Sequence, residues 1–214
     1  MQHKDGSSIL ESFTYTYDKE NNILSTTHVN NLPEDGKKIN ETRVYTYDDY
    51  YNLSSSTKTD HLNDDAQLVT TYTYDQVGNR ASQTTGTATT TYTYNGLNQL
   101  LSKTDSDGTV NYTYDGRGNQ ILEQNTEAGT STEMEYAVTG EMIGLTEYSG
   151  ETATMTQNNL YDHNGIRIMK TEDGASRDYY YDSGACAFTM DGDNVSIANI
   201  LTPQGAVAGS YRDS

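Results

Sequence analysis

The chain has 214 residues and a formal charge of −18, from 31 Asp and Glu against 13 Lys and Arg. Only 33% of the residues are hydrophobic, and there are 19 Tyr, 32 Thr and no Trp. No apolar run approaches the ~20 residues needed to span a bilayer, and so acidic a chain repels nucleic acid and anionic membrane surfaces. Low hydrophobicity with high charge is also typical of disorder. Tyr and Thr are strand formers, however, so we predict a β-rich fold with a core of amphipathic Tyr rings.

Residues 1–12 are expected to be a lead-in to the fold. They read MQHKDGSSILES and lack the apolar segment of a signal peptide, so any export signal is expected to lie elsewhere or to have been removed. The single Cys186 cannot form an internal disulfide, so the fold needs no oxidising compartment.

Residues 13–200 contain an internal repeat, which we interpret as eight units in one continuous array. The tripeptide Tyr-Thr-Tyr occurs five times, and looser copies follow. Successive units are 20 to 30 residues apart, so we take 20 residues as the unit and the excess as loop insertion. The longest insertion is expected around Asn30 to Asn40. Residues 201–214 are a tail or the start of a further repeat.

Each unit predicts two strands and two turns. The Thr-Tyr-Thr-Tyr segment alternates with period two, which places both Tyr rings on one face and the Thr side chains on the other. Four residues after the last Tyr, six of eight units carry Gly or Asn, the residues that most readily adopt positive φ. We expect a turn with a left-handed position there, and expect the units with Tyr51 and Ala185 at this position to differ.

The second strand of a unit is exemplified by residues 99–104 and 120–126. Pairs such as Thr85-Gly86 and Asp173-Gly174 then suit tight hairpins. The segment from Glu133 to Leu145 is the one candidate helix, but it contains Gly140 and Gly144, so we expect no helix. The predicted fold is all-β, with tandem antiparallel β-hairpin repeats that form a curved or spiralling β-strip.

The repeated positions form one structural motif of Tyr, Asp and turn residues. Its members are Tyr15, Tyr17, Asp18, Tyr45, Tyr47, Asp48, Tyr72, Tyr74, Asp75, Gly78, Tyr92, Tyr94, Asn98, Tyr112, Tyr114, Asp115, Gly118, Gly140, Tyr161, Asp162, Gly165, Tyr179, Tyr181 and Asp182.

The tandem motif resembles the YD repeat of the RHS (rearrangement hot spot) family. The best matches are residues 72–80 (YTYDQVGNR) and 112–120 (YTYDGRGNQ), and residues 92–100 (YTYNGLNQL) resemble the variant with Asn at the turn. The resemblance implies large secreted or cell-surface proteins: bacterial RHS and wall-associated proteins, toxin-complex shell subunits and teneurins. In these, the repeats form a β-strip that spirals into a hollow shell, which often encloses a C-terminal toxin domain.

The chain departs from the full family pattern after the repeats. It ends at Ser214 with no recognisable RHS-associated core, where the family's self-cleaving aspartates lie, so no proteolytic residue carries over. The chain therefore resembles an open fragment of such a shell, and its implied partners are the rest of the parent polypeptide and its enclosed domain.

Two features of the repeat leave binding alternatives open. A row of Asp could bind Ca²⁺, and Asp105-Ser-Asp107 and Asp191-Gly-Asp193 resemble pieces of calcium loops. We favour instead an Asp that begins each turn by accepting backbone N–H groups. The Tyr rows could stack on sugars, but we interpret most of them as structural. Carbohydrate binding would use extra rings, namely Tyr50, Tyr51, Tyr148 or Tyr180.

Catalysis has little support in the sequence. Four His residues are scattered over different units, and Cys186 lies among small residues and is expected to be a packed side chain. Chance pairs of carboxylates leave a glycosidase as a remote alternative. We therefore expect a non-catalytic scaffold without cofactor or metal. The leading alternative is a carbohydrate-binding module, and an open array could also self-associate through its edge strands.

Overall fold

The computed structural model describes residues 2–5, 8–31, 38–182, 184–201 and 207–212. These residues form strands and turns, with no helix among them, and hence none long and apolar enough to cross a membrane. Most of the insertion expected around Asn30 to Asn40 falls on residues 32–37, outside the described residues. The chain divides into two halves, an N-terminal half of residues 1–107 and a C-terminal half of residues 108–214, which are described separately.

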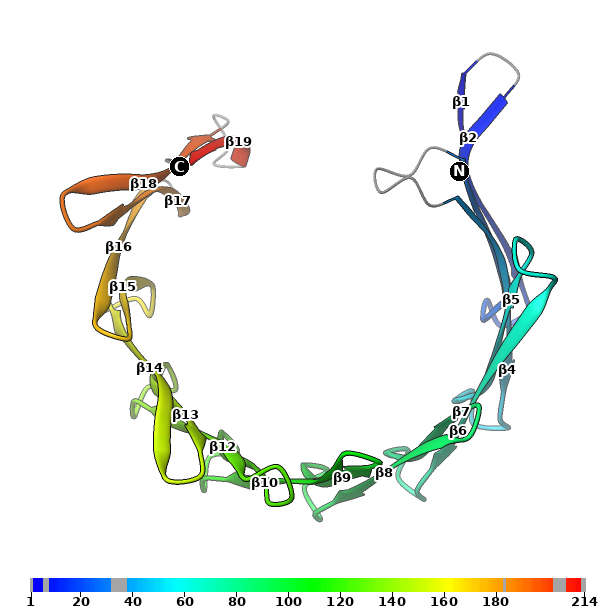
Figure 1. Cartoon of the computed structure of the whole chain (residues 1–214), viewed down its shortest axis with the longest axis horizontal. Coiled ribbons are helices and arrows are strands. Elements are labelled where there is room, and N and C mark those ends of the chain that lie inside the picture. The colour runs from blue at the N-terminus through cyan, green and yellow to red at the C-terminus, as the bar shows by residue number, and fades with distance from the viewer. Residues whose placement is uncertain (1, 6–7, 32–37, 183, 202–206, 213–214) are drawn as a thin grey trace. The chain divides into compact units, whose positions relative to one another are not determined.

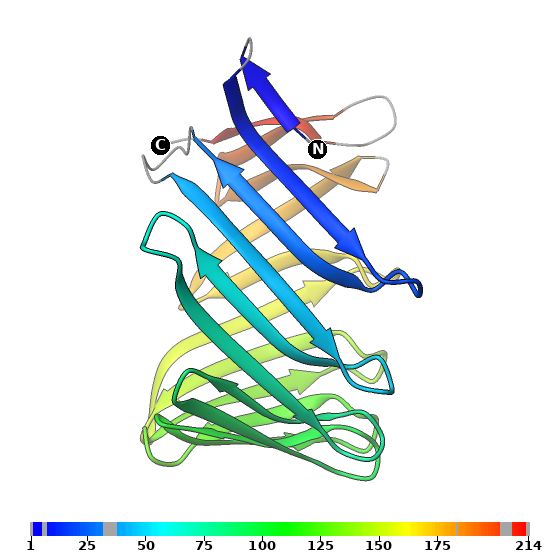
Figure 2. The same cartoon turned by 90° about the vertical axis from the view of Figure 1, so that its right-hand side faces the viewer.

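In the N-terminal half, each strand pairs antiparallel with the next strand in chain order. Figure 2 shows β2 to β6 lying side by side in this order. The strands are β1 (Gln2–Asp5), β2 (Ser8–Tyr17), β3 (Ile23–Asn30), β4 (Ile39–Tyr47), β5 (Leu53–Asp60), β6 (Ala66–Tyr74), β7 (Arg80–Thr85), β8 (Ala88–Tyr94) and β9 (Leu100–Asp105).

In the C-terminal half, too, each strand pairs antiparallel with the next strand in chain order. Its strands are β10 (Gly108–Tyr114), β11 (Gln120–Asn125), β12 (Thr130–Tyr136), β13 (Met142–Ser149), β14 (Thr152–Tyr161), β15 (Arg167–Glu172), β16 (Ala175–Asp182), β17 (Ala185–Asp191), β18 (Asn194–Leu201) and β19 (Val207–Arg212). The labelled strands from β12 to β16 follow one another in this order in Figure 1. The predicted all-β array of tandem hairpins is confirmed, and the segment considered as a helix is the β12–β13 hairpin.

The expected alternation of Tyr and Thr is also confirmed. In β6 and β8 the Tyr side chains are half-buried and the intervening Thr is exposed. In β2 the rings of Tyr15 and Tyr17 lie on the same face, with centroids 6.4 Å apart. The period of two therefore sets the faces of the sheet, as the sequence predicts.

A β-bulge recurs beside the last Tyr of each of the eight units, and the sequence did not predict it. In the third unit, Thr73 lies opposite Ser82 but Tyr74 lies opposite Arg80, so Ala81 is the extra residue. The same shift occurs in the seven other hairpins. Because bulges bend a strand and increase its twist, this position shapes every hairpin in the same way.

The prediction that the Tyr rings form a buried core is wrong. Among the residues whose burial is described, no hydrophobic side chain is fully buried, and the buried residues are Ser12, Asn159 and Thr189. The physical reason is that no second layer covers either face of the strip within either half of the chain, so each Tyr ring is covered only by its neighbours in the sheet. Stability therefore rests on ladder hydrogen bonds and half-buried cross-strand contacts.

Candidate functional site

The turn after each Tyr-Thr-Tyr segment is closed by the Asp that follows it. Oδ1 of Asp115 accepts hydrogen bonds from the backbone N–H groups of Arg117 and Asn119, each at 2.9 Å. Oδ2 accepts one from Nδ2 of Asn119, also at 2.9 Å. The backbone N–H groups of Asp115 and Gly118 complete the turn by donating to the carbonyls of Asn119 and Asp115. We call this arrangement the Asp–Asn clamp.

The clamp recurs along the chain, so the interpretation of the Asp as a turn residue is confirmed. Full copies pair Asp18 with Asn22, Asp48 with Asn52, and Asp75 with Asn79. In the fourth turn Oδ1 of Asn95 accepts the same two backbone bonds, but the side-chain bond is reversed, because Nδ2 of Asn95 donates to Oε1 of Gln99. The Asn partner was missed from the sequence, although its signal was present: an amide side chain four residues after the Asp or Asn.

The turns that begin at Asp162 and Ala137 depart from the clamp. Asp162 binds the backbone N–H groups of Asn164 and Ile166, but Ile166 has no amide to return the second bond. At the sixth turn Ala137 replaces the Asp, and the backbone bonds remain: the N–H of Ala137 donates to the carbonyl of Glu141, and the N–H of Gly140 donates to the carbonyl of Ala137. There the Arg117 side chain donates from Nη1 to the carbonyl of Val138 at 2.7 Å.

The left-handed turn position is confirmed in seven units. The residues four after the last Tyr all have positive φ: Asn21, Tyr51, Gly78, Asn98, Gly118, Gly140 and Gly165. The expectation that Tyr51 marks a different turn is wrong, because Tyr51 has a φ of 65° and the same clamp forms around it. The clamp therefore holds even a Tyr in this conformation. Ala185 does mark a different turn: Gly184 has the positive φ, and Asp182 lies directly opposite Ala185.

Hydrogen bonds keep the clamp carboxylates charged. The Asn side chain lowers the pKa of Asp18, Asp75 and Asp115 below the ordinary value, and the backbone N–H groups lower it further. A carboxylate that accepts several N–H bonds favours its ionised form. These turns therefore carry negative charge throughout the neutral range.

The last Tyr of a unit binds the hairpin before it. The hydroxyl of Tyr47 donates to the carbonyl of Ile23 at 2.8 Å, and that of Tyr74 donates to the carbonyl of Leu53 at 2.9 Å. In each case the acceptor is the first residue of the strand after the preceding turn. Three further copies are Tyr94 to Arg80, Tyr161 to Met142 and Tyr181 to Arg167. Partial burial raises the pKa of Tyr74, Tyr94 and Tyr181.

The opposite face of the sheet carries cross-strand hydroxyl pairs in the N-terminal half of the chain. The Thr between the two Tyr bonds a Ser on the next strand at 2.7 Å in four successive hairpins: Thr16–Ser25, Thr46–Ser55, Thr73–Ser82 and Thr93–Ser102. In the C-terminal half, Thr113 and Glu135 keep a polar side chain at this position, whereas the last two repeats have apolar or aromatic pairs there. Leu160 lies opposite Met169, and the Tyr180 and Phe188 rings stack with centroids 4.5 Å apart.

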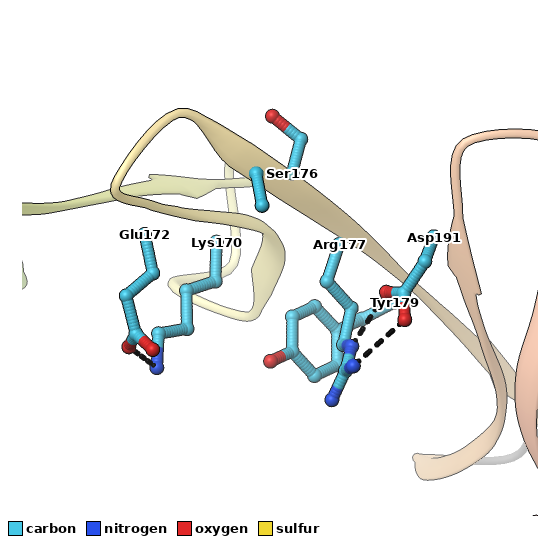
Figure 3. A pocket seen from close by; sticks show the side chains of 7 residues that line it. Lys170, Glu172, Ser176, Arg177, Tyr179 and Asp191 are labelled. Atoms are coloured by element: carbon cyan, nitrogen blue, oxygen red, sulfur yellow. Dashed lines mark hydrogen bonds and ion pairs between the residues drawn. The ribbon is translucent and has the colours of Figure 1, made fainter. Parts of the chain in front are cut away.

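A hollow of about 300 Å³ lies on β15 and β16, with Lys170, Arg177 and Tyr179 among its lining residues (Figure 3). Arg177 binds both oxygens of Asp191, at 2.7 and 2.8 Å, and Lys170 pairs with Glu172. The hydrogen bonds with Asp191 raise the pKa of Arg177 and lower that of Asp191, so both remain charged. The charges in this hollow thus have partners from the chain itself.

The His and Cys side chains are separated in the described residues. His28 stacks on Phe13, with ring centroids 4.2 Å apart. Cys186 is half-buried, with Sγ 3.6 Å from the carbonyl of Phe188. His3 lies in β1, where only the backbone is described.

One His joins a hydroxyl and a carboxylate, which the sequence did not predict. His61 Nδ1 lies 2.6 Å from Asp65 Oδ1, and its Nε2 lies 2.9 Å from Thr42 Oγ1. This is the order of a nucleophilic triad. The Asp65 side chain is mostly exposed to water, and the contacts tie the β5–β6 turn to β4.

The calcium and sugar candidates fall in different surroundings. Asp105 pairs with Lys103 at 2.8 Å, and Asp191 is held by Arg177. No group of three or more His, Cys, Asp or Glu that could hold a metal occurs in the part of the chain searched. Of the extra rings, Tyr148 donates to Glu133 and Tyr180 stacks on Phe188, whereas Tyr50 and Tyr51 are exposed.

Fold and repeat together define an all-β repeat protein built from tandem antiparallel hairpins. Within that class, residues 94–131 match the family model of the RHS repeat, so the resemblance seen in the sequence is confirmed over this segment. No curated protein is matched.

Solved structures with similarity include the crystal structure of TcdB2-TccC3 without its hypervariable C-terminal region. The identity is 16% and the TM-score 0.46, over 97% of this chain and 12% of that one. A second, TcdB2-TccC3-TEV, has 14% identity and a TM-score of 0.35, over 80% of this chain and 13% of the other. The chain thus spans a small part of the length of the structures it matches.

Proposed function

We propose that this chain is a non-catalytic scaffold, a segment of the β-shell of a larger secreted or cell-surface protein of RHS type. The observation that carries the proposal is the recurrent unit itself. Its Asp, Asn, Tyr and turn residues bind one another or the neighbouring hairpin, as the clamp of Asp115 and Asn119 and the bond from Tyr74 to Leu53 illustrate. Residues engaged in this way support an architecture rather than a reaction.

The enclosed partner in this proposal is a C-terminal, toxin-like domain of the parent polypeptide. The RHS repeat match over residues 94–131 supports it. The test is to sequence the reading frame on both sides of this chain, to express the whole product and to digest it with a protease. We expect a fragment C-terminal to the repeats to be protected. Digestion of that fragment as fast as when it is expressed alone would contradict enclosure.

The absence of catalysis is tested separately. The protein is incubated with nitrophenyl esters, nitrophenyl glycosides and casein, beside a His61→Ala variant that breaks the contacts to Thr42 and Asp65. We expect both proteins to match the buffer blank. Turnover by the unmodified chain that disappears with His61→Ala, or with a carboxylate substitution, would overturn the non-catalytic assignment.

Carbohydrate binding is a second proposal, favoured by one observation. Tyr50 is 85% exposed and borders a hollow of about 720 Å³ that Asn52, Asp75 and Gln76 also line. An exposed ring beside amide and carboxylate groups suits the stacking and hydrogen bonding of a sugar. A glycan array with the unmodified chain and Tyr50→Ala tests this. No signal at millimolar sugar, or an equal signal from both proteins, would count against it.

Self-association through edge strands is the remaining proposal on partners. An open sheet presents unpaired backbone groups at its edges. Sedimentation velocity over a range of protein concentrations tests it, and a single concentration-independent species of monomer mass would contradict it.

A further inference from the structure

Three turns at one end of the strands in the N-terminal half present apolar side chains at the same repeat position. Tyr50, Val77 and Leu97 each lie three residues after the last Tyr of their unit, and they are 85%, 70% and 79% exposed. We call them the apolar row. They follow strands β4, β6 and β8, so their turns lie at the same end of the antiparallel strands. We call this row of strand ends the turn edge, which is distinct from the edge strands of the sheet.

The turn itself does not require apolar residues at this position. The backbone N–H of Tyr50, Val77 and Leu97 donates to the Oδ1 atom of the first turn residue at 2.9, 3.0 and 2.9 Å. In the first turn Glu20 makes the same backbone bond at 3.0 Å with a charged side chain. Because single exposed apolar residues are normal but aligned ones mark interaction surfaces, the row points to a partner.

The row is continuous in space. The hollow of about 720 Å³ is lined by Tyr50 and Asn52 of one turn and by residues of the next, including Val77. The turn that carries Val77 is also bonded to the turn that carries Leu97, because Asn79 Nδ2 donates to Asn98 Oδ1 at 3.0 Å. The three turns therefore form one surface along the edge.

The spacing of the row selects the shape of the partner. Adjacent strands are ~4.8 Å apart, so turns two strands apart repeat about every 10 Å. An α-helix that rises ~1.5 Å per residue brings every seventh residue to the same face at about 10.5 Å. A β-strand presents same-face side chains at about 6.7 and 13 Å, which does not match. A helix laid along the edge can therefore place one apolar side chain at each turn.

Charge selects the partner's polar residues. The four turns of this edge carry Asp18, Glu20, Asp48, Asp49 and Asp75 against the single cation Lys19. The clamp keeps Asp18 and Asp75 ionised, because Asn22 and Asn79 lower their pKa. We infer that the apolar row docks an amphipathic α-helix with an apolar residue at every seventh position and Lys or Arg beside it.

A synthetic peptide serves as the probe: a Lys-rich helix with Leu at every seventh position, labelled for fluorescence anisotropy. Two controls have the same composition with the Leu positions scrambled, and the same Leu positions with Glu in place of Lys. We expect the heptad Lys peptide to bind and both controls to bind at least tenfold more weakly. Equal binding of the scrambled peptide would overturn the inference.

Variants of the protein give the matched comparison. Val77→Ser with Leu97→Ser should weaken the heptad peptide at least tenfold, whereas Leu62→Ser should not, because Leu62 is 55% exposed in the β5–β6 turn on the opposite edge. The circular dichroism and melting temperatures of the variants should equal those of the unmodified chain. Unchanged peptide binding by the double variant would refute the proposed role.

Two further arms distinguish other occupants of the same edge. If the Val77→Ser/Leu97→Ser variant loses binding to phosphatidylcholine vesicles while no protein binds the peptide, the row is a lipid contact and the helix is wrong. If only Tyr50→Ser matters, and for sugars alone, the edge is a carbohydrate site and the helix is again wrong. None of these outcomes bears on the enclosure of a C-terminal domain, so the scaffold proposal is tested independently.

Discussion

Asn119 holds Asp115 at both of its carboxylate oxygens, with the backbone N–H on Oδ1 and the side-chain amide on Oδ2, each at 2.9 Å. Asp115→Ala removes every side-chain bond of this clamp, whereas Asp115→Asn keeps a carbonyl oxygen that can accept the backbone bonds. We expect Asp115→Ala to lower the melting temperature more than Asp115→Asn. Thermal unfolding followed by circular dichroism checks this, and equal shifts would show that the clamp does not stabilise the turn.

The turn glycines are predicted to differ according to their φ angles. Gly118 has a φ of 92°, whereas Gly116 in the same turn has no positive φ and a Cβ there would meet nothing within 4 Å. Gly118→Ala should cost about 1–3 kcal/mol in the free energy of unfolding through backbone strain. Gly116→Ala is the matched control and should cost less. Urea unfolding measures both, and equal costs would contradict the strain argument.

The Tyr hydroxyls are expected to link successive hairpins. Tyr74→Phe deletes the bond to the carbonyl of Leu53, so we expect a loss of about 0.5–1.5 kcal/mol, the net value of one hydrogen bond. Tyr17→Phe is the control. Tyr17 is 54% exposed, and the preceding strand β1 pairs only with residues 8–12 of β2, so it does not extend alongside Tyr17. A Tyr74→Phe variant as stable as the Tyr17→Phe variant would show that the Tyr hydroxyl bonds contribute nothing to stability.

The sixth turn offers a restoration of the clamp. Ala137 and Glu141 occupy the Asp and Asn positions, and the carboxylate oxygen Oε2 of Glu141 has no hydrogen-bond partner. Ala137→Asp alone places two carboxylates together and should lower the melting temperature, whereas Ala137→Asp with Glu141→Asn should raise it above that of the unmodified chain. A double variant no more stable than the Ala137→Asp single variant would contradict the clamp model.

Stability should fall at acid pH with a defined sign. The pKa of the clamp carboxylates is lower in the folded chain than the ordinary value, because Asn79 and Asn119 hydrogen-bond Asp75 and Asp115. Their contribution is therefore complete above the unfolded pKa of about 4 and is lost as the pH falls through the folded pKa. Melting temperatures at pH 7, 4 and 3 test this. Asp75→Asn/Asp115→Asn should flatten the decrease, and an unchanged slope would contradict it.

The residue pattern predicted much of the local structure. Period-two alternation placed the Tyr and Thr on opposite faces, and Gly or Asn four residues after Tyr marked the left-handed turn. Both follow from backbone geometry within a few residues, so they can be inferred without the fold. Tyr51 shows the limit of that inference, since it adopts the same positive φ because the surrounding clamp from Asp48 to Asn52 holds it.

By itself, then, the sequence determined the repeat, its strands and turns, its acidity and the role of the Asp that begins each turn. Only the tertiary structure decided what each Tyr hydroxyl binds, since Tyr74 and Leu53 meet only after two hairpins pair. It also replaced the expected core with a single layer and aligned Tyr50, Val77 and Leu97 on one edge. These are relations between strands, and the register that creates them depends on cross-strand contacts and bulges rather than on the local pattern.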